Sequence, residues 1–166
     1  MKKSILLAAF LCLTTIGFSQ ETTAKYDENL AKFLNADERG MKQYVFCILK
    51  TGSNTTATAE EKNNLFKGHM DNISRLAKEG KLVLAGPFEK NDRNYRGLYI
   101  FNVATIEEAK ALVATDPAVK ANIFEVELTP WYGTAALQEI LKIHEKIVKP
   151  KIYFFFQQRH TLLPKK

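Results

Sequence analysis

Residues 68–88 read GHMDNISRLAKEGKLVLAGPF, in which an amphipathic helix passes through a glycine into a short apolar strand. Before the glycine, apolar side chains recur at intervals of three and four residues, the spacing of one helix face. Gly80 can end the helix, because glycine adopts the left-handed backbone of a C′ position at little cost. We expect a helix over residues 59–79 and a strand over residues 81–85. The apolar stripe of the helix comprises Leu65, Phe66, His69, Met70, Ile73, Leu76 and Ala77, and such a stripe normally faces the core.

Two helices carry the same start signal. Thr58 with Glu61, and Thr105 with Glu108, fit the S/T-x-x-E capping box. In this motif each of the two side chains satisfies a free backbone N–H of the first helical turn. A helix should therefore begin directly after each threonine.

Three further strands complete the pattern. Residues 43–49 and 98–103 are rich in apolar and β-branched side chains, and residues 124–129 alternate between apolar and polar ones. The resulting order is strand, helix, strand, strand, helix, strand. This order is typical of the α+β class with a ferredoxin-like split βαβ (βαββαβ) fold, whose antiparallel sheet carries both helices on one face. The other face needs a cover, so we expect a homodimer.

Residues 41–132 therefore form the main domain, and four segments flank it. Residues 1–20 pair two lysines with an apolar run too short to span a bilayer comfortably, which indicates a cleaved signal peptide and export to the periplasm or the medium. Residues 21–40 predict an N-terminal helical extension, and residues 133–149 a C-terminal amphipathic helix. The basic and apolar tail, residues 150–166, is either poorly ordered or an added edge strand.

The charge is nearly balanced once the flanks are set aside. The formal net charge is +6, but residues 21–146 carry 17 basic and 18 acidic side chains. Such a body has no field that attracts polyanions, so nucleic acid is not an expected partner. After the signal segment no apolar run approaches the length of a membrane span, so no membrane association is expected after cleavage.

Cys47 is the one cysteine outside the signal segment, and it lies in the apolar run YVFCIL. One thiol cannot form an internal disulfide, so we expect it to pack in the core. The three histidines lie far apart in the sequence, without the spacing of a metal-binding motif. No metal site and no hydride or redox cofactor is expected.

Two residues are suited to proton transfer. His69 lies on the apolar helix stripe, and an imidazole can move protons in either direction near neutral pH. Asp116 precedes Pro117, as an N-cap precedes a proline at the first helical position. A carboxylate against one ring nitrogen would fix the tautomer of the imidazole and make an acid/base site. Each residue also has a structural explanation, which is packing for the histidine and capping for the aspartate.

Residues 68–88, together with residues 97–131, GLYIFNVATIEEAKALVATDPAVKANIFEVELTPW, resemble the YCII-related (YciI-like) domain family, particularly its exported members. The likeness extends over about residues 25–148. It implies a dimeric α+β barrel of the ferredoxin-like type, with His69 and Asp116 at the positions of a His–Asp active-site pair. Relatives include dehydrochlorinase-like enzymes acting on small aromatic compounds, and the wider barrel group contains isomerases and monooxygenases. The fold alone does not choose among these reactions.

These observations predict an exported homodimer that binds a small organic molecule. Its chemistry would be a cofactor-free elimination or isomerisation through His69 and Asp116, of the lyase or isomerase type. The alternative is a non-catalytic ligand-binding or interaction module on the same fold, in which the pair ties a helix to a turn. A pair that opens into a pocket favours the enzyme, and a sealed pair favours the module.

Other side chains receive structural interpretations. His144 lies on the apolar side of the last helix, where packing or an interface contact is expected. Trp131 and Tyr132 follow the last expected strand and should seal the end of the sheet, although an aromatic ligand site is the alternative. Glu125 and Glu127 share one strand face, which is either solvent or the inside of a dimeric barrel.

Overall fold

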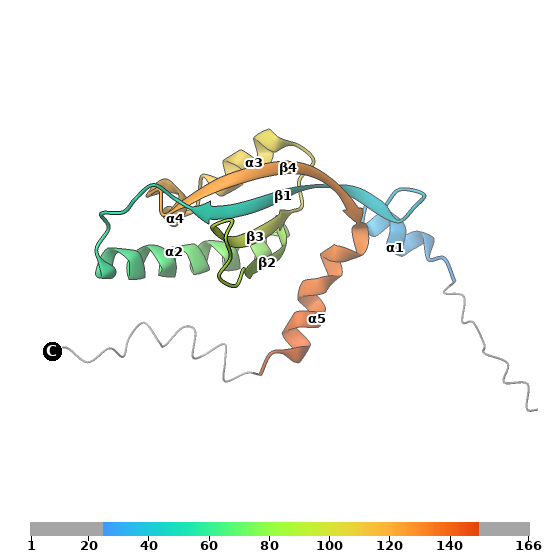
Figure 1. The fold of residues 1–166 in the computed structure, drawn as a ribbon. Coiled ribbons are helices and arrows are strands. Elements are labelled where there is room, and N and C mark those ends of the chain that lie inside the picture. The colour runs from blue at the N-terminus through green and yellow to red at the C-terminus, as the bar shows by residue number, and fades with distance from the viewer. Residues whose placement is uncertain (1–24, 150–166) are drawn as a thin grey trace, which may run out of the picture.

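The computed structural model describes residues 25–149, and its helices and strands follow the expected order (Figure 1). The expected signal segment, residues 1–20, and the tail, residues 150–166, lie outside the described residues. Within the described part, no helix combines the length and the apolar character needed to cross a membrane. The elements are α1 (Glu28–Phe33), β1 (Met41–Thr51), α2 (Ala59–Lys78), β2 (Leu82–Pro87), β3 (Tyr95–Phe101), α3 (Ile106–Val113), α4 (Pro117–Lys120), β4 (Phe124–Thr134), the 3-10 helix η1 (Ala135–Glu139) and α5 (Ile140–Ile147).

Four antiparallel strands form one sheet in the order β2-β3-β1-β4. This is the strand order of the ferredoxin-like fold, so the predicted α+β fold class is confirmed. The central strand β1 pairs with β4 along the whole length of both strands. Its pairing with β3 shifts register between Leu49 and Lys50.

Local sequence signals set the helix boundaries as predicted. At Thr58 and at Thr105, the threonine hydroxyl accepts the backbone N–H of the third helical residue, and the glutamate there accepts the backbone N–H of the threonine. Such caps are typically worth about 1 kcal/mol each. Gly80 follows α2 with φ at +66°, the left-handed region that favours glycine. Both expected capping boxes and the expected glycine stop are confirmed.

The main core lies between the sheet and the helices α2, α3 and α4. Val45, Cys47 and Leu49 reach it from alternate positions of β1, and the thiol is buried as expected. Met70 is 45% exposed, so its expected place in the buried stripe of α2 is wrong. The other buried core residues are Leu76, Leu82, Tyr99, Phe101, Val103, Ala109, Val113, Ala118 and Phe124.

The intervening positions of β1 face the opposite side of the sheet. A smaller cluster of Tyr44, Val83 and Ile100 lies there, and Leu137 of η1 packs against it. The C-terminal segment therefore covers one end of this face, and α5 continues from η1 and contacts β2 (Figure 1). The rest of the face forms a groove of about 900 Å³, called here the open-face groove.

The two ends of the domain differ from expectation. β4 continues to Thr134 instead of ending near Thr129, because β1 is long enough to pair with all of it. The last helix accordingly starts later, as the 3-10 turn η1, and His144 is exposed on α5. The expectation that His144 packs within its own chain is therefore wrong.

Candidate functional site

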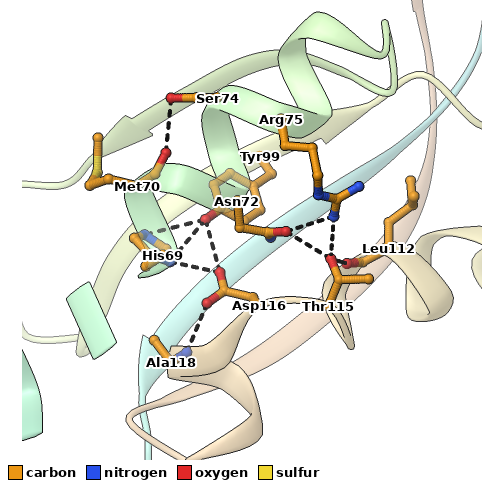
Figure 2. A network of polar contacts seen from close by, with 10 residues as sticks. All are labelled: His69, Met70, Asn72, Ser74, Arg75, Tyr99, Leu112, Thr115, Asp116 and Ala118. Atoms are coloured by element: carbon orange, nitrogen blue, oxygen red, sulfur yellow. Dashed lines mark hydrogen bonds and ion pairs between the residues drawn. The ribbon is translucent and has the colours of Figure 1, made fainter. Parts of the chain in front are cut away.

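His69 of α2 and Asp116, which precedes α4, meet in the structure (Figure 2). His69 Nδ1 lies 2.6 Å from Asp116 Oδ2, a short hydrogen bond. Little of the pair is accessible, since His69 is 8% exposed and Asp116 is 1% exposed. The contact lies on the helix side of the sheet.

The two carboxylate oxygens of Asp116 have separate partners. Oδ1 accepts the backbone N–H of Ala118 at 2.9 Å, which is the N-cap bond expected before Pro117. Oδ2 faces His69 Nδ1. Because an ionised carboxylate only accepts hydrogen bonds, the neutral ring carries its proton on Nδ1 and leaves Nε2 as the basic nitrogen. Capping and pairing are therefore both carried out by one side chain.

Tyr99 of β3 is a third member of the site that the sequence analysis missed. Its hydroxyl lies 3.3 Å from each ring nitrogen of His69 and donates to Asp116 Oδ2 at 3.4 Å. Burial, and then the negative charge of Asp116, raise the pKa of Tyr99 well above its usual value. The hydroxyl therefore keeps its proton at neutral pH. The alternation of side chains along the strand could have indicated this position, because it places Tyr99 on the same face as Phe101.

Aromatic rings enclose the imidazole of His69. The ring centroid of Phe124 is 5.1 Å away, that of Tyr99 is 6.0 Å away in a stacked arrangement, and that of Phe66 is 6.3 Å away and edge-on. Such apolar walls lower the local dielectric and strengthen the hydrogen bond that they surround. Phe66 was expected on the apolar stripe of α2, and it packs against the main core there.

The close approach of α2 and α4 depends on Gly68. A Cβ built on this glycine would lie 2.6 Å from Pro117 Cγ, a distance that real Cβ atoms essentially never show. Any larger residue would therefore separate the two helices. The absence of a side chain at Gly68 lets the helix bearing His69 approach the turn bearing Asp116.

Two hollows on the surface of residues 25–149 are lined by residues other than His69 and Asp116. About a tenth of the His69 side chain is accessible. The smaller hollow, of about 570 Å³, is lined by Tyr26, Ala36, Asp37, Glu38, Arg39 and Tyr132. The open-face groove is lined by Phe46, Ile48, Phe88, Glu89, Lys90, Asn91, Asp92, Arg93, Tyr95, Glu127, Thr129 and Trp131.

The remaining candidate residues lie away from the pair. Trp131 lines the open-face groove, while Tyr132 donates its hydroxyl proton to Asp37. Glu127 forms an exposed ion pair with Lys50 at the groove. Among the described residues, no three His, Cys, Asp or Glu side chains gather closely enough to hold a metal ion.

Comparisons with known proteins bear on the main domain. The model of the family described as the YCII-related domain matches residues 44–132, just over half of the chain. No curated protein matches the chain. One similar solved structure is 5-chloro-2-hydroxyhydroquinone dehydrochlorinase (TftG) from Burkholderia phenoliruptrix AC1100, in complex with 2,5-dihydroxybenzoquinone. The similarity has 19% sequence identity and a TM-score of 0.39, and it covers 52% of this chain and 92% of that one.

Proposed function

The chain belongs to the YCII-related domain family, and from this we propose that it is a small-molecule enzyme that transfers protons without a cofactor. His69 is the base, Asp116 orients it, and the substrate is a small organic molecule with an acidic C–H bond. The supporting observation is the 2.6 Å contact between His69 Nδ1 and Asp116 Oδ2. It fixes the tautomer in which Nε2 is free to accept a proton.

The proposed reaction starts when Nε2 of His69 takes a proton from carbon next to an electron-withdrawing group. The carboxylate of Asp116 then faces a cationic ring and stabilises it. In an elimination, the C–H electron pair forms a new π bond and the leaving group departs with its bonding pair. In an isomerisation, the same nitrogen returns the proton to a different carbon. The substrate reaches the ring over the accessible tenth of the His69 side chain.

A second candidate function is a non-catalytic module on the same fold. It is favoured by the burial of the pair and by the two surface hollows, which other residues line. In this alternative, the hydrogen bond only ties α2 to the turn before α4. The open-face groove, which contains Phe88 and Trp131, would then be the binding surface.

Deuterium exchange of small carbon acids in D₂O distinguishes the two functions. Wild type and His69→Gln are compared on nitroethane, acetylacetone and levulinate, with exchange followed by proton NMR. Loss of a general base should slow enzyme-dependent exchange by roughly 10² to 10⁴-fold. His144→Gln is the matched control, because it removes an exposed imidazole distant in sequence from the pair.

Equal exchange by wild type and His69→Gln would overturn the proposed chemistry. Saturable binding of a panel member to both proteins, with no exchange by either, would support the module. Slower exchange by His144→Gln as well would show that the probe detects histidines in general and not this site.

We also propose that the protein is exported and forms a homodimer through the open-face groove. Phe88 and Trp131 are 38% and 36% exposed there. An apolar concave face of this kind is commonly covered by a partner. Export rests on the predicted signal over residues 1–20, and the mass of the protein recovered from the producing cell tests it. A protein that keeps all 20 residues contradicts cleavage.

A further inference from the structure

The turn between α3 and α4 lies against α2 in an antiparallel register (Figure 2). Three residue pairs join the turn to α2, and the pair of His69 and Asp116 is the middle one. Successive residues of the turn thus meet positions on one face of α2 in reverse order. Thr115 contacts Asn72, Asp116 contacts His69, and Pro117 contacts Gly68.

Asn72 forms the polar contact of this register. Its side chain is buried, with 7% of the residue exposed. Its Oδ1 accepts a hydrogen bond from Arg75 Nη2 at 2.7 Å and lies 2.9 Å from the hydroxyl of Thr115. The single proton of that hydroxyl is shared between Asn72 Oδ1 and Leu112 O, which lies 2.6 Å away. The same Arg75 nitrogen donates to Thr115 Oγ1 at 2.8 Å, which closes a triangle of side chains. Glu79 holds the other terminal nitrogen of Arg75 at 2.9 and 3.0 Å.

Capping alone does not place the carboxylate of Asp116 against α2. The N-cap bond to Ala118 fixes the side chain relative to α4, which has only four residues. The contact between Gly68 and Pro117 is apolar and has no preferred direction, so it limits the approach of α4 without fixing its position along α2. The bridge through Asn72 is directional, because its hydrogen bonds weaken steeply away from their preferred geometry.

We propose that Asn72, with Arg75 and Thr115, is a positioning residue that holds the carboxylate of Asp116 on His69 Nδ1. The catalytic meaning of this role rests on the proposed function, while the positioning itself does not. A displacement of about 1 Å takes a 2.6 Å hydrogen bond beyond its range, and misplacement of that size costs up to roughly 10²-fold in rate.

The test compares three variants by the ¹⁵N NMR spectrum of the His69 ring. Asn72→Leu removes the acceptor at similar volume, and the Nδ1–H signal should weaken as the two tautomers mix. Asn72→Asp keeps an acceptor for Arg75 and Thr115, and the wild-type signal should return. Ser74→Ala is the control, because this hydroxyl donates to Met70 O within α2 and does not reach the turn. Exchange of the carbon acids should fall about 10- to 100-fold for the leucine variant only.

A folded Asn72→Leu protein with the wild-type ring spectrum would overturn the proposal. Should that variant not fold, Thr115→Val is an isosteric change at an exposed position, with the same expected spectrum. It removes the bridging hydroxyl together with its hydrogen bond to Leu112 O. A changed ring spectrum in a protein whose wild type transfers no protons would support the positioning role and overturn the catalytic function. The experiment therefore distinguishes a failure of the positioning role from a failure of the proposed catalytic function.

Discussion

Gly68 lies so close to Pro117 that a Cβ built on the glycine would be 2.6 Å from the proline Cγ. The next residue along α2 is His69, and the residue before the proline is Asp116. The contact between a glycine and a proline therefore sets the gap that the hydrogen bond between His69 and Asp116 bridges.

Gly68→Ala should destabilise the protein and lengthen the contact between His69 and Asp116. Overpacking costs about 1–3 kcal/mol and alanine gains about 1 kcal/mol over glycine in a helix interior, so the net loss is about 0–2 kcal/mol. The 2.6 Å approach to Pro117 Cγ places this site toward the upper end of that range. Urea unfolding measures the free energy, and the ¹⁵N ring spectrum of His69 reports the contact. Gly86→Ala is the matched control, because a Cβ there meets nothing within 4 Å. A Gly68→Ala variant at least as stable as the wild type would show that α4 can move away from α2 at no cost in free energy.

Asp116→Asn should invert the tautomer of His69. The asparagine oxygen takes over the cap on Ala118 N–H, so its NH₂ group faces Nδ1 and moves the ring proton to Nε2. Proton transfer should then fall by roughly 10² to 10⁴-fold, as for loss of the base. Asp116→Ala also loses the cap and should be less stable than the asparagine variant by about 1 kcal/mol. Persistence of the Nδ1–H signal in Asp116→Asn contradicts the assigned tautomer.

Tyr99→Phe tests the third member of the site. The change removes one hydroxyl near His69 and Asp116 and keeps the ring, so stability should fall by about 1 kcal/mol. Exchange of carbon acids should fall as well, by about tenfold, because the pair loses a hydrogen-bond donor. Tyr44→Phe is the control: its hydroxyl donates to Thr134 O on the other side of the sheet. Equal exchange rates in the two variants would show that the Tyr99 hydroxyl does not contribute to proton transfer.

Stability should fall in alkali through the thiol of Cys47. Burial, and then the negative charge of Asp116, raise its pKa from 9.0 to about 12. Below pH 9 the thiol is neutral in both the folded and the unfolded chain, and its contribution is fully present. Between these two values only the unfolded chain ionises, so stability is lost by about 1.4 kcal/mol per pH unit.

Chemical denaturation at a series of pH values measures this slope. Cys47→Ala removes the thiol and should show a shallower decline than the wild type. Burial also raises the pKa of Tyr44 to about 12, which adds a decline of the same sign to both proteins. The difference between the two curves therefore isolates Cys47. Parallel curves would contradict the predicted contribution.

Phe46→Lys should dissociate the proposed dimer. The substitution puts a charge among the residues that line the open-face groove, and taking a charge out of water is costly in a closed interface. Sedimentation velocity should show the variant as a monomer at concentrations where the wild type is dimeric. Met70→Lys is the control, since Met70 is an exposed apolar residue on α2, outside the groove. A wild type that sediments as a monomer at micromolar concentration contradicts the dimer directly.

The fold was predictable because its main signals are local. The two capping boxes, Gly80 and the alternation of residues 124–129 each depend on neighbours in sequence. The length of β4 was not predictable, because the residues beyond Thr129 become strand only by pairing with β1. The stripe of α2 was predicted correctly except at Met70. Met70 is exposed because its surroundings depend on tertiary packing.

Only His69 and Asp116 of the candidate site were predictable from the sequence. His69 and Asp116 each combine a reactive residue type with a recognisable local position. Tyr99, Asn72 and Gly68 acquire their roles from what lies opposite them. The alternation of side chains along β3 indicates that Tyr99 faces the core. No local pattern, however, predicts the antiparallel register between α2 and the turn.

The strict alternation of β1 makes this strand intolerant of changes in length. Val45 and Cys47 point toward the helices and the acid/base pair, while Tyr44 and Phe46 point toward the opposite face. Deleting one residue would move the side chains on one side of the deletion to the opposite face of the sheet, which would disrupt both faces. Substitutions at the even-numbered positions alone would act on the face of the proposed dimer and would leave the residues around His69 unchanged. The proposed assembly and the proposed chemistry would therefore be separable traits, although both depend on β1.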